Sequence, residues 1–259
     1  MKFLTSRLAS WRRNLGVFPR ISDVMLYRRM WDSQASSKPK SLRVREAGGN
    51  PLLFRPGTTD LKVLWDTFYH KYHLPPVDLK PDCTIVDLGA YVGYTVAHFA
   101  YLYPKSLIIA VELDKDNIKI ASQNIKSFQA RCELKHAAVW SKNGHVAYGG
   151  EEEWGFHVFD QDSDISTSIK KAPARTLDSI FEEYNLENVD YLKMDIEGAE
   201  ANVLKGPMNW IKLVQSMKIE VHPQFNPEAT AENCIKILQS LDFKCRKDNF
   251  HPQSIIAVK

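Results

Sequence analysis

The sequence predicts an α/β fold in which a mostly parallel, doubly wound sheet carries helices on both faces. From about residue 82 onward, apolar runs of strand length alternate with segments of helical periodicity, the pattern of a parallel sheet with crossover helices. At residues 84–96 one apolar run ends in an acid, turns through Gly89 and Gly93, and continues as a helical pattern. Nucleotide-type ligands bind at such corners because a helix N-terminus offers unpaired N–H groups.

Composition and charge exclude several classes of protein. The 259 residues are 44% hydrophobic and 25% charged, which is ordinary for a soluble globular protein with one principal core. The net charge of +3 is small and the basic residues are dispersed, so we expect no nucleic-acid partner. No run approaches the roughly 18 apolar residues that a membrane span needs. The oligomeric state is not indicated.

The cysteines and the N-terminus bear on the compartment. The cysteines lie far apart and lack the spacing of a zinc site or a disulfide scaffold, so reduced thiols in the cytoplasm are expected. The basic N-terminus has no acid before Asp23, which is typical either of a short amphipathic helix or of an organelle transit peptide. We expect a helix there and a cytoplasmic protein. The cysteines are Cys83, Cys132, Cys234 and Cys245.

The chain divides into an N-terminal appendage, residues 1–58, and a main domain, residues 59–259. The appendage begins with helical periodicity up to about residue 35. An alternating run at 42–46, a glycine turn and an apolar run at 52–54 then predict a β-hairpin.

The main domain opens with a helix at about 60–73, whose apolar residues fall on one face. Arg55 and Asp60 stand beside its start. They are candidates for contact with a substrate or cofactor, and a capping and surface role fits them equally well.

The glycine turn at 84–96 separates two kinds of cofactor. Gly89 and Gly93 would allow a ligand close to the backbone because they lack Cβ atoms. The dinucleotide pattern G-x-G-x-x-G requires a further glycine where Tyr91 stands. This departure disfavours a nicotinamide cofactor.

A second strand, at 106–114, ends in Glu112 about twenty residues after the turn. In doubly wound folds an acid at this position holds the ribose hydroxyls of the cofactor; the alternative is a solvated acid after a buried strand. A third strand is expected at 133–140, with its C-terminal end beside the adenine.

The segment 143–175 interrupts the alternation and is predicted to be an insertion. It contains turn residues, an acidic run, a strand-like stretch at 154–159 and a polar tract. Such an insertion is either a loop that faces the substrate or a disordered flap, and the aromatic residues Trp154, Phe156 and Phe159 favour the loop. The elements expected around and after it are helices at 115–128, 177–184, 198–206 and 231–241, strands at 189–195 and 214–221, and a closing pair of strands.

Two later strands end in residues suited to acid–base chemistry. Asp195 ends the strand at 189–195, and His222 follows the strand at 214–221. Both should project at the carboxyl edge of the sheet, where ligands bind, and a histidine has an ordinary pKa near neutrality. They are the predicted catalytic pair, with His222 as general base. Lys193 shares the face of Asp195 and contacts either the substrate or an acid in a salt bridge.

A metal site is the alternative at the same place. Asp195, Glu197, Glu200 and His222 form an oxygen-rich set with one imidazole, which suits magnesium or manganese. Acids at the start of a helix are also favourable simply because they complement the helix dipole. We expect no metal.

Four blocks together resemble one family. ValAspLeuGlyAlaTyrValGlyTyrThr (86–95), GluLeuAsp (112–114), TyrLeuLysMetAspIleGluGlyAlaGlu (191–200) and IleGluValHisPro (219–223) are similar to the FkbM family of S-adenosylmethionine-dependent methyltransferases. The resemblance runs from about residue 55 to 223, and the third block is its most specific part. It implies the Rossmann-like class I methyltransferase fold, with a mostly parallel seven-stranded sheet that closes in an antiparallel hairpin.

The resemblance also implies a ligand and its residues. The cofactor is S-adenosyl-L-methionine. Apart from the resemblance, we expect Lys193, Glu197, Glu200 and Trp154 to contact the acceptor. The implied cofactor residues are Asp87, Gly89, Ala90, Tyr91, Gly93, Tyr94, Thr95, Glu112, Leu113, Ala138 and Asp195.

The function that follows is methyl transfer to a hydroxyl of a small molecule or of a glycan sugar. One alternative is a cofactor-binding scaffold that has lost the chemistry. The other is a nicotinamide-dependent oxidoreductase, which the glycine spacing disfavours.

Overall fold

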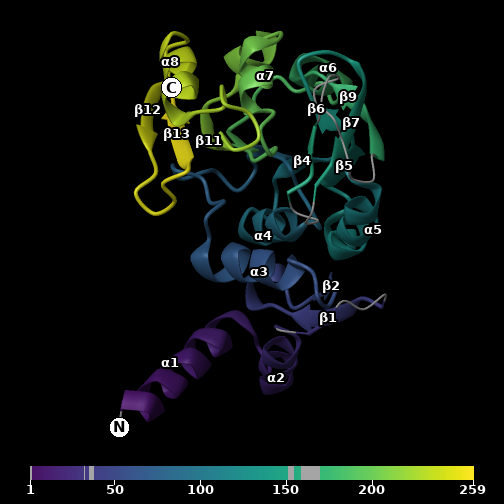
Figure 1. Cartoon of the computed structure of the whole chain (residues 1–259), viewed down its shortest axis with the longest axis vertical. Coiled ribbons are helices and arrows are strands. Elements are labelled where there is room, and N and C mark those ends of the chain that lie inside the picture. Colours follow the sequence, from purple (N-terminus) through teal and green to yellow (C-terminus); the bar gives the residue numbers. More distant parts are fainter. Residues whose placement is uncertain (1, 32, 35–37, 151–154, 159–169) are drawn as a thin grey trace.

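The computed structural model describes residues 2–31, 33–34, 38–150, 155–158 and 170–259. The protein is built around a seven-stranded central sheet (Figure 1). Neighbouring strands run parallel from β5 to β11, and β13 is antiparallel to both its neighbours. The predicted mostly parallel sheet with a closing antiparallel pair is therefore confirmed. In sheet order the strands are β12 (Lys244–Lys247), β13 (Ser254–Val258), β11 (Ser216–Glu220), β10 (Tyr191–Met194), β3 (Thr84–Leu88), β4 (Leu107–Glu112) and β5 (Cys132–His136).

Helices cover both faces of this sheet because alternate residues of each buried strand point to opposite faces. Val86 and Leu88 of β3 pack in the cluster that contains residues of α6, α7 and α8. Ile85 packs in another cluster, with Phe99 of α4 and with Ile125, which follows α5. The helices are α4 (Tyr94–Leu102), α5 (Lys115–Asn124), α6 (Leu177–Glu183), α7 (Glu200–Lys205) and α8 (Ala231–Gln239).

The insertion builds a second, four-stranded sheet in the order β6-β9-β7-β8. The predicted strand at 133–140 divides at Ala137, so that only β5 joins the central sheet and β6 pairs with β9. The strand-like stretch at 154–159 contributes β8, while Trp154 and Phe159 lie outside the described residues. The strands are β6 (Ala138–Val139), β7 (Gly144–Gly149), β8 (His157–Val158) and β9 (Lys170–Arg175).

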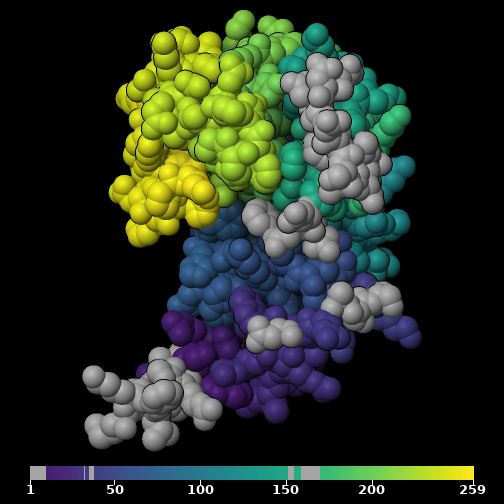
Figure 2. Space-filling view, viewed as in Figure 1, coloured from purple at the N-terminus to yellow at the C-terminus, as the bar shows by residue number. Residues whose placement is uncertain are grey.

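The N-terminal elements pack at the end of the molecule opposite the C-terminal strands (Figure 2). The hairpin is confirmed, because β1 and β2 pair antiparallel. The helix expected at 60–73 is α3 followed by a π-helical turn that ends at His70. The elements are α1 (Lys2–Val17), α2 (Ile21–Met30), β1 (Lys40–Arg43), the short 3-10 helix Arg45–Ala47, β2 (Pro51–Phe54), α3 (Asp60–Trp65) and the turn Asp66–His70.

The appendage shares a hydrophobic cluster with the main domain. Phe18 and Leu52 are buried together with Leu64 of α3 and with Tyr94 and Ala97 of α4. Figure 1 shows α3 between the first elements and α4. Across the described part of the chain, every helix is too short or too polar to cross a membrane.

The turn after β3 brings two strands into close contact. Gly89 has φ +80°, and a Cβ atom there would overlap the carbonyl oxygen of Asp195 and lie 2.9 Å from its carbon. At Gly93 a Cβ would lie 3.2 Å from atoms of Ala121 and Ile125. Both glycines therefore allow protein backbone and helices to approach, whereas we expected from the sequence that they make room for a ligand.

We predict that Gly89→Ala lowers the free energy of unfolding by more than about 3 kcal/mol, because left-handed strain and overlap with backbone add together. The matched control is Gly49→Ala. Gly49 has φ +73° but nothing within 4 Å of the new Cβ, so only the strain of about 1–2 kcal/mol applies. Urea unfolding of both variants measures the difference. Equal losses would show that the contact with Asp195 is unimportant.

Candidate active site

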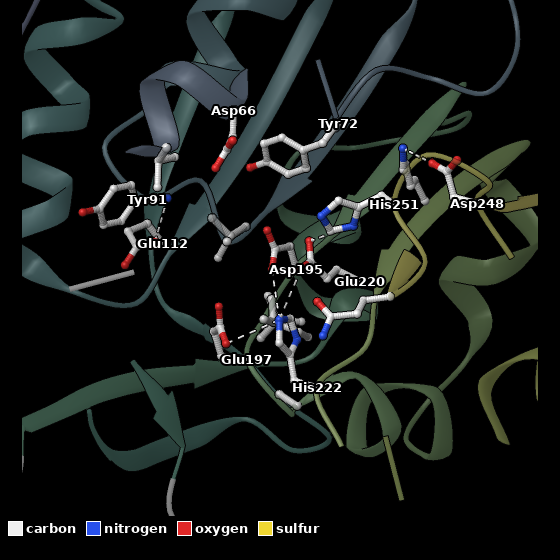
Figure 3. Close-up of a pocket in the computed structure, with 18 of the residues that line it drawn as sticks. Asp66, Tyr72, Tyr91, Glu112, Asp195, Glu197, Glu220, His222, Asp248 and His251 are labelled. Atoms are coloured by element: carbon white, nitrogen blue, oxygen red, sulfur yellow. Dashed lines mark hydrogen bonds and ion pairs between the residues drawn. The ribbon is translucent and has the colours of Figure 1, made fainter. Parts of the chain in front are cut away.

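A cavity of about 1050 Å³ lies at the carboxyl edge of the central sheet (Figure 3). Residues at the C-terminal ends of four adjacent parallel strands line it: Gly89 after β3, Glu112 of β4, Asp195 after β10 and Glu220 of β11. Further walls come from the α3 region, the β12–β13 loop and the insertion. This is where an open parallel sheet binds its ligands.

Glu112 stands at one end of the cavity and is 5% exposed. Its Oε2 accepts the N–H of Tyr91 at 2.9 Å, and its Oε1 accepts the N–H of Asp114 at 2.8 Å. Burial raises the pKa of Glu112 to about 7. Leu113 and Ala138 line the same cavity. A carboxylate beside apolar walls fits a ligand that pairs a diol with a flat ring, which is the chemistry of an adenosine.

Tyr91 connects the glycine turn to the segment before the core. Its backbone is left-handed, with φ 51°, and its hydroxyl donates to Asp60 Oδ1 at 2.5 Å. Arg55 donates to the same hydroxyl at 3.1 Å and forms a two-pronged pair with Asp60. Neither Arg55 nor Asp60 lines the cavity. The structure thus places the two residues in a polar cluster with Thr59 that supports the turn.

Several predicted cofactor residues face the protein. Asp87 is fully buried, accepts the hydroxyl of Thr95, and lies 3.5 Å from Lys193 Nζ; burial raises its pKa. The Tyr94 hydroxyl donates to the carbonyl of Leu53 at 2.8 Å. The predicted cofactor residues that do not line the cavity are Asp87, Ala90, Gly93, Tyr94 and Thr95, whereas Gly89, Tyr91, Glu112, Leu113, Ala138 and Asp195 do.

Acidic side chains gather around His222, which also lines the cavity and is 3% exposed. Its Nδ1 is 2.9 Å from Glu200 Oε1. Its Nε2 lies 3.7 Å from Asp195 Oδ1 and 3.5 Å from Glu197 Oε2. Glu220 Oε1 is 3.8 Å from the same nitrogen. Figure 3 shows Asp195, Glu197 and Glu220 around His222.

The surroundings set the charge of this cluster. Burial opposes the charged imidazole, but Glu200 and Asp195 outweigh it and raise the pKa of His222 to about 10. Burial and the charge of Asp195 raise the pKa of Glu197 to about 9 and that of Glu220 to about 8. The crowded carboxylates thus make the imidazole a stronger base than an ordinary histidine. The pKa of His222 lies above the near-neutral value expected from the sequence because several carboxylates converge on one ring.

Lys193 lies beneath the cluster and binds Asp195 Oδ2 at 3.1 Å. Burial opposes its charge, yet Asp195 and Asp87 hold its pKa well above the usual value, and the same pairing lowers the pKa of Asp195. Of the two contacts considered for Lys193 from sequence, the structure has the salt bridge. Lys193 and Glu200 do not line the main cavity, Glu197 does, and Trp154 lies outside the described residues.

Sequence reasoning missed several residues of the cavity. Glu220 ends β11 two residues before His222, so its position at a strand end was an available signal. His251 and Phe250 come from the β12–β13 loop, and nothing local in the sequence places that loop over the sheet edge. Phe156 of the insertion does line the cavity.

The strand order, the acid after the second strand and the cavity at the carboxyl edge define a class I methyltransferase fold. The methyltransferase FkbM domain matches residues 87–245 of this chain. The chain therefore belongs to the FkbM methyltransferase family. The resemblance found in the sequence is confirmed, and so is the cofactor of that family, S-adenosylmethionine.

Individual relatives are more distant. The chain is 27% identical over 162 residues to 2-O-methyltransferase NoeI of Sinorhizobium fredii, a match that covers 52% of this chain and 63% of the relative. It is 26% identical over 125 residues to O-methyltransferase imqG of Aspergillus flavus, covering 43% and 51% respectively. The matches thus span less than two thirds of either relative. A crystal structure of methyltransferase FkbM from Methylobacillus flagellatus shares the fold, with TM-score 0.50, 13% identity, and coverage of 91% of this chain and 59% of that chain.

We predict that S-adenosylhomocysteine binds more tightly as pH rises through about 7, the pKa of Glu112, and that affinity levels off above it. We expect the ribose hydroxyls to donate to the ionised carboxylate, so protonation of Glu112 at lower pH would oppose binding. Calorimetric titrations between about pH 5.5 and 8.5 measure this, since a single group gives up to a tenfold change per pH unit.

Glu112→Gln is the control. At the upper end of that range it should cost about 1.5–3 kcal/mol of binding and should remove the rise near pH 7, because the amide does not titrate. The same pH dependence in wild type and variant would exclude Glu112 as the ribose ligand.

Proposed function

We propose that this chain is a methyltransferase that moves a methyl group from S-adenosylmethionine to a hydroxyl oxygen of a small molecule or glycan sugar. The observation that carries the proposal is that Glu112, Asp195 and His222 all line one cavity. A nucleoside held at Glu112 thereby has an acid–base cluster within the same enclosure.

The remaining cavity wall supports a hydroxylated acceptor. Beyond the acid cluster it carries donors and acceptors of both signs: Lys218, Gln224, Asp248, His251 and Gln253. Such a mixed set suits the many hydroxyls of a sugar better than a purely apolar molecule. The names of both relatives, each an O-methyltransferase, agree with oxygen as the acceptor atom.

Aromatic side chains at the cavity add a surface for a ring. Phe250 is 96% exposed although it borders the cavity, and Phe156 borders it from the insertion. The flat face of a sugar or aryl ring can pack on such groups. In this proposal they help to hold the acceptor against the polar wall.

The reaction forms a bond between the acceptor oxygen and the methyl carbon, breaks the bond between that carbon and sulfur, and releases the hydroxyl proton. Alignment supplies much of the rate, up to roughly 7–11 kcal/mol of the barrier. The proton goes to the pair Asp195 and His222, which lie 3.7 Å apart. Lys193 fixes one oxygen of Asp195 and Glu200 fixes the imidazole ring, so both groups are held in place.

The first experiment is a calorimetric titration with S-adenosylhomocysteine and, separately, with NAD. Binding of the former alone supports the proposal, and binding of NAD alone contradicts it. Transfer of labelled methyl to a panel of glycans and small hydroxylated molecules then distinguishes an enzyme from a scaffold that binds the cofactor without reacting.

We predict that His222→Ala lowers kcat by roughly 10²- to 10⁴-fold, because the proton acceptor and its ring of carboxylates are disrupted. Affinity for S-adenosylhomocysteine should change little, since Glu112 ends β4 whereas His222 follows β11, three strands away in the sheet. Single-turnover methyl transfer and calorimetry give the two quantities. A His222→Ala enzyme with full rate would move the proton transfer to another residue.

A further inference from the structure

Three carboxylate oxygens point to one nitrogen without forming hydrogen bonds to it. His222 Nε2 lies 3.5, 3.7 and 3.8 Å from oxygens of Glu197, Asp195 and Glu220. These separations exceed the 2.7–3.2 Å of an N–H···O bond. Two ligands of one Mg²⁺ or Mn²⁺ ion at about 2.1 Å lie roughly 3.0 Å apart when adjacent and 4.2 Å apart when opposite. The observed spacing falls within that interval.

Glu200 orients the ring so that Nε2 faces the acids. It lies 2.9 Å from Nδ1, is fully buried, and also accepts backbone N–H groups of Ile196 and Gly198. Because Glu200 is an acceptor, Nδ1 donates to it. In the neutral ring, which is the form that binds a metal, Nε2 then presents its lone pair, and metal binding displaces any proton held there. A carboxylate behind a histidine in this way is the usual outer partner of a metal-binding imidazole.

Glu197 provides an independent indication. The residue is 7% exposed, and its Oε2 has no hydrogen-bond partner among the described residues. This buried oxygen points at His222 Nε2 from 3.5 Å. An acceptor so placed is unfavourable unless a cation or a donor stands in front of it. The nitrogen beside it belongs to a set of three ligand atoms, from Asp195, Glu220 and His222, that all lie within 4.8 Å of one another.

We propose that Asp195, Glu220 and His222 bind one divalent cation of the Mg²⁺ or Mn²⁺ class, with Glu197 beside the imidazole. Two carboxylates and an imidazole form a mainly oxygen set, which such ions prefer. The set differs from the one considered from the sequence: Glu220 enters it, and Glu200 moves behind the histidine. Only the role of the ion rests on the proposed function. The ion coordinates the acceptor hydroxyl and makes it more acidic, and the proton passes to Glu197, because Asp195 and His222 are then occupied as ligands.

The test uses the full chain after removal of metals by a chelator. Titration with Mn²⁺, followed by calorimetry and by loss of the free-ion paramagnetic resonance signal, should reveal one saturable site that Mg²⁺ displaces. Glu220→Gln and His222→Gln should each weaken binding by about 10-fold or more. Glu228→Gln is the matched control because this carboxylate is exposed and pairs only with Lys205 among the described residues, so its binding should equal that of wild type.

Binding of S-adenosylhomocysteine by each variant shows that the fold is intact. No saturable Mn²⁺ binding below about 1 mM, the affinity of weak protein sites, would overturn the inference. So would wild-type affinity in both ligand variants, or binding of Zn²⁺ alone. Labelled-methyl transfer is measured separately. Full transfer in chelator, without bound Mn²⁺, would contradict the metal site and leave the proposed methyltransferase activity standing. Mn²⁺ binding without transfer to any acceptor would contradict the proposed activity and leave the metal site standing.

Discussion

The close contact between the turn after β3 and the end of β10 determines how the two halves of the cavity meet. The N–H groups of Gly89 and Ala90 both donate to the carbonyl of Val111, which anchors the turn to β4. On the other side, Asp195 donates its N–H to Leu88, and its carbonyl occupies the space where a side chain of residue 89 would stand. Glu112 and Asp195 are therefore held on opposite sides of a single glycine.

The part of the cavity around His222 is determined mainly by interactions between charged side chains. Asp195, Glu197, Glu200 and Glu220 surround the imidazole of His222, and Asp195 and Asp87 pair with the ammonium of Lys193. With all groups ionised, five negative charges against two positive charges leave an excess of three. The raised pKa values of Glu197 and Glu220 reflect this crowding. A cationic ligand, whether a sulfonium or a metal ion, reduces the repulsion among these carboxylates. The cluster therefore attracts positive charge through its net charge alone, in addition to any specific contact.

The sequence predicts the central sheet well because each of its elements has a local pattern. Glu112, Asp195 and His222 were found as residues at strand ends, and the parallel order brings strand ends together. The sequence could not predict that β6 leaves the central sheet after Ala137. β5 and β6 have the same periodicity, and they differ only because β6 pairs with β9, more than thirty residues away. The charge of His222 was missed for a similar reason: it depends on acids that only the tertiary structure brings within 4 Å.

Tyr91 shows how a departure from a motif can be compensated at a distance. A non-glycine residue with left-handed backbone costs about 1–2 kcal/mol, and each hydrogen bond to a charged group returns roughly 1.5–3 kcal/mol. The hydroxyl of Tyr91 has such bonds with Asp60 and Arg55, which come from the segment before the core. The same residue donates its N–H to Glu112. The segment before the core is thus connected to the proposed ribose site through the side chain and the backbone N–H of Tyr91. A substitution at Arg55 or Asp60 therefore acts on Glu112 through Tyr91, although neither residue lines the cavity.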